Sequence, residues 1–230
     1  EGNTFGIMAA PFTPMTIYVV NAEMKAYVES KLTDHAKTYI TVVALTVPGT
    51  ATDLSNALGN GERVVLNADL TFSASETTAN SGYGATGVSV TNGAIFDGNG
   101  HTLRVNNAGG TWDCAINAKN GTIKNLTVAG AMRGIFMGGA DGDVVIDNVI
   151  FKDVVYTFNS DAGNKEYGVY ISNSTLNGWT SFSNAHKEVV FTDCTFGKGS
   201  GYAFCRPYNP CVFENCEFST DMQFDTTQQA

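Results

Sequence analysis

Side chains suited to sugar binding gather in the second half of the chain. In small-molecule sites, aromatic rings supply apolar contact area while a few polar groups fix the orientation of the ligand. Residues of both kinds lie in or beside the loops that follow a recurring phenylalanine: Asp161, Trp179, His186, Tyr202, Arg206 and Tyr208. We expect these loops to form one ligand-binding surface. Alternatively, Trp179 and Tyr202 cover the edge of the core, and the sequence leaves both interpretations open.

The same loops are poor in catalytic groups. A glycosidase needs two carboxylates that flank the scissile bond. The loops offer one carboxylate, Asp161, with His186 in the next repeat and Arg206 in the one after. The other two histidines, His35 and His101, complete no set with metal-ligand spacing. We therefore assign no catalytic residue and predict neither a metal ion nor a cofactor.

A repeat along the chain indicates what positions these loops. Five segments share one pattern: apolar, any residue, Asn or Asp, small or apolar, any residue, apolar. Successive Asn or Asp positions are 23, 25, 20 and 22 residues apart, at Asn125, Asn148, Asn173, Asp193 and Asn215. A period of about 22 residues predicts stacked coils that share one continuous core. Asn suits the bend of each coil because it tolerates left-handed backbone angles and can hydrogen-bond along the stack.

A phenylalanine recurs at a second phase of the repeat. Phe136, Phe158, Phe182 and Phe204 lie 11, 10, 9 and 11 residues after the corresponding Asn or Asp. Parallel strands lie about 4.8 Å apart, which is close enough for rings of neighbouring coils to touch. We therefore expect four buried rings that stack on one interior face.

The five cysteines are too few and too unevenly spaced for a disulfide framework. Cys194 and Cys216 share one inward phase of successive coils. In-register parallel side chains make the disulfide dihedral awkward there, so two buried thiols are favoured over a bridge. Cys205 and Cys211 bracket a loop with two prolines, where a bridge stays open.

The coils expected before Asn125 follow the repeat pattern less closely. Phe96–Leu103, with the sequence FDGNGHTL, is similar to a turn in the first coils of pectin-lyase-like proteins. Residues from about 50 to 218 resemble that superfamily of single-stranded right-handed parallel β-helices. The resemblance implies that a short helix expected at residues 52–58 plugs the open end of the bore.

The resemblance also indicates which activities to look for. Pectate lyases carry clustered aspartates that bind calcium, and polygalacturonases carry paired aspartates with a Gly-His-Gly. Pectin methylesterases place glutamines on the groove. This sequence has no Asp-Asp and no Gly-His-Gly, and its glutamines occur only at 223, 228 and 229. The resemblance therefore implies a fold and no particular activity.

The domain organisation follows from these patterns. We predict an all-β fold over residues 51–218, a right-handed parallel β-helix (solenoid) of about seven coils with an N-terminal capping helix. Residues 1–50 read as a small α+β segment (strand, helix over 22–36, strand), either packed on the solenoid or part of a preceding domain. Residues 219–230 read as a C-terminal tail.

The net charge of the chain limits which binding partners we expect. The net charge is −9 with no basic run, which disfavours nucleic acid. No stretch of 18 apolar residues is present, so we expect no transmembrane helix.

We expect an extracellular or cell-surface module, with any leader outside this sequence. It binds a polysaccharide or another cell-surface component without catalysis, as adhesins do. The alternatives are a polysaccharide lyase or glycoside hydrolase with an atypical site, and a structural spacer. The oligomeric state stays open.

Overall fold

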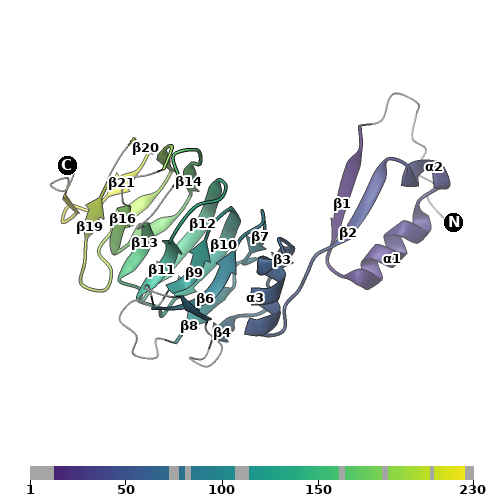
Figure 1. Ribbon diagram of the computed structural model, residues 1–230, viewed down its shortest axis with the longest axis horizontal. Coiled ribbons are helices and arrows are strands. Elements are labelled where there is room, and N and C mark those ends of the chain that lie inside the picture. The colour runs from purple at the N-terminus through teal and green to yellow at the C-terminus, as the bar shows by residue number, and fades with distance from the viewer. Residues whose placement is uncertain are drawn as a thin grey trace. The chain divides into compact units, whose positions relative to one another are not determined.

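The computed structural model describes residues 13–72, 78–80, 84–106, 114–160, 164–182, 186–207 and 210–225. The chain divides into two compact units, residues 1–46 and 47–230 (Figure 1). The smaller unit contains two parallel strands and two helices: β1 (Met15–Val19), α1 (Ala22–Lys31), α2 (Asp34–Lys37) and β2 (Ile40–Ala44).

The single helix predicted over residues 22–36 is interrupted. Asn21 caps α1 as expected, its side chain accepting the Met24 amide at 2.8 Å. Helix α1 ends at Lys31 because Leu32 is extended, with φ −76° and ψ 134°. Thr33 then begins α2, and its Oγ1 accepts the Ala36 amide at 3.2 Å. A hydroxyl that binds its own downstream amides favours a new cap over a helix interior.

The larger unit is mostly β. Its first element is helix α3 (Ala51–Gly59), and its strands form two long sheets. The 12-stranded sheet contains β3 (Arg63–Val65), β4 (Leu70–Phe72), β7 (Ile95–Asp97), β8 (Thr102–Val105), β10 (Gly121–Ala129), β12 (Val144–Lys152), β14 (Val169–Ser172), β15 (Thr175–Asn177), β17 (Val189–Thr192), β18 (Thr195–Gly197), β20 (Cys211–Glu214) and β21 (Glu217–Phe218). The 8-stranded sheet contains β5 (Thr78–Asn80), β6 (Gly84–Val90), β9 (Cys114–Ala118), β11 (Arg133–Met137), β13 (Tyr156–Ser160), β16 (Trp179–Phe182), β19 (Phe204–Arg206) and β22 (Gln223–Phe224).

Strands of both sheets stack in chain order. One path runs β3-β7-β10-β12-β14-β17-β20 and the other β6-β9-β11-β13-β16-β19-β22, which Figure 1 shows as a colour sequence from blue to yellow. Among the described strands of these sheets, every pairing is parallel except that of β5 with β6. The prediction of a mostly β, solenoid-like parallel fold is thus confirmed. The segment predicted as a tail carries the last strand, β22, which pairs with β19.

The predicted Asn and Asp bends are confirmed in backbone geometry. All five have left-handed φ values between 51° and 54°: Asn125, Asn148, Asn173, Asp193 and Asn215. Hydrogen bonds link part of the ladder, since Asn148 Nδ2 donates to Asn125 Oδ1 at 2.9 Å, and Asn125 Nδ2 to Asp97 Oδ1 at 3.0 Å. Asn215 likewise donates to Asp193. Where these bonds form, the bend of one coil supports the bend of its neighbour.

Apolar side chains of both sheets meet in one buried core. Ile123, Leu126 and Val128 of β10 belong to it, with the residues at their register positions in neighbouring coils. Helix α3 contributes Leu54 and Leu58, both fully buried in the same cluster. Packing of α3 against the first strands follows from its narrow apolar face.

The predicted ladder of four stacked phenylalanines is wrong. Phe158 and Phe182 lie in the core with ring centroids 6.4 Å apart. Phe136 is also buried, but it pairs in register with Asn159, whereas its neighbour Ile135 pairs with Phe158. Phe136 consequently faces the other side of the sheet.

A difference of one residue in the distance from the Asn bend explains this error, because Phe136 lies 11 residues after Asn125 and Phe158 lies 10 residues after Asn148. Strands β11 and β13 pair without a register shift, so the extra residue puts Phe136 one position beyond the register partner of Phe158. One residue more or less in a strand moves every later side chain to the opposite face. Counting from the Asn bend therefore fixes the strand but not the face. Phe204, the fourth residue of the predicted ladder, is half-buried and pairs with Trp179.

Candidate functional site

Three aromatic residues form a row on the outer face of the 8-stranded sheet. Tyr156 of β13 pairs in register with Trp179 of β16, which pairs with Phe204 of β19. The ring centroids are 4.9 Å and 4.6 Å apart. Thr180 and Cys205, which follow the last two rings, are fully buried, so strand alternation directs the rings away from the core. We call Tyr156, Trp179 and Phe204 the aromatic row.

A tight hairpin brings a fourth ring to this row. Gly199 and Tyr202 exchange two backbone hydrogen bonds, of 2.8 Å and 2.9 Å. Ser200 and Gly201 between them have φ values of 48° and 86°, as a type I′ turn requires. The turn holds the Tyr202 ring 5.4 Å from that of Trp179 and leaves Tyr202 43% exposed. The position of Tyr202 is therefore set by a short, well-defined turn.

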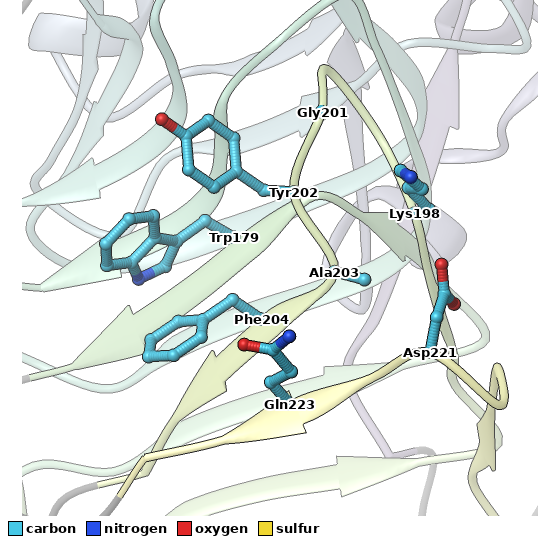
Figure 2. A pocket seen from close by; sticks show the side chains of 8 residues that line it. All are labelled: Trp179, Lys198, Gly201, Tyr202, Ala203, Phe204, Asp221 and Gln223. Carbon is cyan, nitrogen blue, oxygen red and sulfur yellow. The ribbon is translucent and has the colours of Figure 1, made fainter.

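An open pocket lies beside these rings. It has a volume of about 360 Å³, and Figure 2 shows the aromatic rings on one side with Lys198 and Asp221 on the other. Its lining residues are Trp179, Lys198, Gly201, Tyr202, Ala203, Phe204, Asp221 and Gln223. The pocket thus combines apolar ring surface with a cation, a carboxylate and a carboxamide.

The one carboxylate among the lining residues is suited to binding. Ser219 Oγ donates to Asp221 Oδ1 at 2.6 Å, and this hydrogen bond lowers the pKa of Asp221, with the charge of Lys198 adding to the effect. Asp221 is therefore ionised at neutral pH and accepts hydrogen bonds. A general acid needs a raised pKa and a second carboxylate partner. The lining residues supply neither.

Trp179 leaves a hydrogen-bond donor unused. Its indole Nε1 is buried and has no partner among the described residues. A buried indole N–H usually finds an acceptor, because an unsatisfied donor costs free energy. This donor belongs to the ring at the centre of the aromatic row.

The structure brings together two of the six residues predicted for binding, Trp179 and Tyr202. Arg206 lies two residues after Phe204 on β19, where its Nη2 donates to Asp225 Oδ2 at 2.8 Å. It does not line the pocket. Asp161 and Tyr208 fall outside the described residues.

His186 lies inside the fold instead of on the binding surface. It is 4% exposed, and its Nε2 is 2.7 Å from Ser160 Oγ. Ser160 pairs in register with the core residue Phe182. Burial lowers the pKa of His186, so the imidazole is neutral at pH 7. Both side chains of the pair are buried.

Sequence reasoning missed four residues of the pocket and the row: Tyr156, Lys198, Asp221 and Gln223. It also assigned Phe204 to the core. A signal was present, because Tyr156, Trp179 and Phe204 follow one another at steps of 23 and 25 residues, the spacing of the coils. Rings that recur at the coil period mark one line along the solenoid.

The cysteines are thiols in the structure, in both candidate pairs. Cys194 Sγ lies 3.4 Å from the Thr192 carbonyl oxygen and 3.5 Å from that of Ile171. Burial raises the pKa of Cys194 to about 11 and that of Cys205 to about 12. Both are therefore protonated and poor nucleophiles at neutral pH.

Within the described ranges, no group of three His, Cys, Asp or Glu side chains is arranged to hold a metal ion. The helices of this part of the chain are also too short or too polar to cross a membrane.

The fold and the site together define a parallel β-solenoid with an aromatic row and a pocket on one outer sheet face. Comparisons with models of known protein families, with curated proteins and with solved structures give no significant match. The function is accordingly argued from the site.

Proposed function

We propose that this chain is a non-catalytic glycan-binding module. The observation that carries the proposal is the aromatic row, which meets Tyr202 around a pocket that also holds Lys198, Asp221 and Gln223. Ring edges and faces pack on the apolar C–H surfaces of sugars, while the polar groups bind hydroxyls. Trp179 lies at the centre of the row and lines the pocket.

The scaffold is a right-handed β-helix of the pectin-lyase-like type. Support comes from the turn Phe96–Leu103 and from parallel sheets whose strands succeed one another in seven layers, from β3 to β20. Helix α3 covers the first coil, since it packs against β3, β4 and β6. A module of this kind acts outside the cell or on its surface, where it attaches to polysaccharide.

The preferred ligand is a neutral glycan. The chain carries a net charge of −9, and Asp221 is an ionised carboxylate beside the only cation of the pocket lining, Lys198. A polyuronate would meet repulsion from both the site and the whole molecule. Neutral sugars, which are rich in hydroxyl groups, meet no such electrostatic repulsion.

The proposal is tested by calorimetric titration of neutral oligosaccharides and of polygalacturonate into the whole chain. Burying one ring stabilises a contact by about 1.5–3 kcal/mol. Trp179→Ala and Tyr202→Ala should therefore each weaken binding about tenfold to a hundredfold. Tyr27→Ala is the matched control, because Tyr27 is 59% exposed and lies in the smaller unit. Its affinity should equal that of the unaltered chain.

Two outcomes contradict the proposal. Release of reducing ends or of unsaturated products from a bound glycan, lost in Asp221→Asn, identifies an enzyme with an atypical site. Absence of binding across a broad glycan array identifies a structural spacer.

A further inference from the structure

Two charged groups of the pocket have fixed roles in hydrogen bonding. Lys198 can only donate hydrogen bonds, and the ionised carboxylate of Asp221 can only accept them. Ser219 Oγ holds this carboxylate in place, since it donates to Asp221 Oδ1 at 2.6 Å. The pocket therefore offers one donor and one acceptor that cannot exchange roles.

Lys198 and Asp221 lie near each other without forming an ion pair. Figure 2 shows both on the side of the pocket away from the aromatic rings. The hydrogen bond from Ser219 and the charge of Lys198 both lower the pKa of Asp221, so the two charges interact. None of the ion pairs between described residues, however, includes Lys198 or Asp221. A gap separates them, and a small polar group of a ligand can bridge it.

Apolar surface borders this gap. Trp179, Tyr202 and Phe204 form the opposite side of the pocket, and Figure 2 shows Ala203 between the rings and the charged groups. The Tyr202 side chain is 43% exposed, so it has free surface for a ligand. An occupant should thus present an acceptor to the lysine, a donor to the carboxylate and an apolar surface to the rings.

An acetamido group on a sugar has this combination. Its carbonyl oxygen accepts, its N–H donates and its methyl group is apolar. In a planar trans amide the C=O and the N–H point in opposite directions, as a group that bridges a gap between a donor and an acceptor requires. The single oxygen of a hydroxyl has to serve both sides, and it brings no apolar surface.

We propose that the pocket binds a neutral sugar that carries an acetamido group, in preference to the same sugar with a hydroxyl at that position. The carbonyl oxygen accepts from Lys198 Nζ, the N–H donates to the Asp221 carboxylate, and the methyl group packs on the rings. This inference rests on the proposed glycan binding and names the class of sugar that the same site selects.

The test compares two trisaccharides of the same linkage by calorimetric titration into the whole chain. Triacetylchitotriose carries an acetamido group at C2 of each sugar, whereas cellotriose carries a hydroxyl there. The acetylated ligand should bind about fivefold to twentyfold more tightly, because cellotriose leaves Lys198 and Asp221 without matched partners.

Two variants should remove this preference. Lys198→Met loses the donor and Asp221→Ala loses the acceptor, so each should bring the ratio of the two affinities close to one. Lys187→Met is the matched control, because Lys187 is exposed and does not line the pocket. This control should keep the ratio of the unaltered chain.

The outcomes separate the acetamido preference from glycan binding itself. Cellotriose that binds as tightly as triacetylchitotriose would overturn the preference and leave glycan binding in place. A preference that persists in both variants would contradict the roles of Lys198 and Asp221. Binding of neither trisaccharide would also overturn the preference, and the glycan array then decides the proposed function.

Discussion

At the residue scale, the bends of the coils depend on one side-chain type. Asn148 has φ 53° and donates a hydrogen bond of 2.9 Å to Asn125. A residue with a Cβ pays about 1–2 kcal/mol in this region of backbone space unless its side chain bonds locally, as Asn does. Glycine adopts it without strain.

Asn148→Ala should therefore lower the free energy of unfolding by about 1–2 kcal/mol, and Asn148→Gly by less. Chemical denaturation of the three proteins gives the comparison. Equal losses for Ala and Gly would show that the lost hydrogen bond, and not the backbone angle, sets the cost.

A second residue-scale prediction concerns pH. Burial lowers the pKa of His186 below its ordinary value of 6.5 in the folded state. Below pH 6.5 the unfolded chain binds a proton that the folded chain does not, so stability falls as pH falls. Above pH 6.5 both states are neutral and the contribution of His186 to the pH dependence vanishes.

Melting between pH 8 and 5 should show this loss, and His186→Gln should flatten the slope below pH 6.5. An unchanged slope in His186→Gln would assign the acid sensitivity to other groups.

At the element scale, the order in which strands stack can be predicted from the sequence, whereas the face on which a side chain lies cannot. The period of Asn125, Asn148 and Asn173 is enough to predict which strands stack, because a bend residue with left-handed angles leaves a clear sequence signal. The face of a side chain depends on the exact residue count within a strand. Phe136 lies 11 residues after its bend and Phe158 lies 10 after its own, and this one-residue difference puts the two rings on opposite faces.

Only some of the residues that line the pocket could be predicted from the sequence. Trp179 and Tyr202 are recognisable as large aromatic residues near loops, and both line the pocket. Lys198, Asp221 and Gln223 join them only because β18, the Gly199–Tyr202 hairpin and β22 meet in space. Gln223 lies where the sequence indicated a tail.

The two faces of the sheet should respond differently to ring removal. Phe158 is fully buried in the core, so Phe158→Ala should destabilise the fold by about 3–5 kcal/mol. Phe204 lies half-buried on the outer face, so Phe204→Ala should cost less stability and weaken glycan binding. Denaturation and calorimetric titration of both variants separate these effects. A larger loss of stability for Phe204→Ala would place that ring in the core.

At the scale of the whole molecule, charge governs the choice of ligand. The net charge is −9, and the described residues hold no cluster that fits a metal ion. A bound neutral glycan should therefore keep its affinity in EDTA and change little between low and high salt. Polygalacturonate should bind weakly or not at all, with and without calcium. Calcium-dependent binding of polygalacturonate would contradict this account of the surface.

The most direct test of glycan binding follows the indole N–H of Trp179 by NMR. The chain has two tryptophans, Trp112 and Trp179, and a Trp112→Phe variant assigns the two indole signals. Because Trp179 lines the pocket, a sugar bound there should shift its indole signal saturably, with the same midpoint as the calorimetric titration. Saturable glycan binding that leaves the Trp179 signal in place would contradict the assignment of the aromatic row as the binding site.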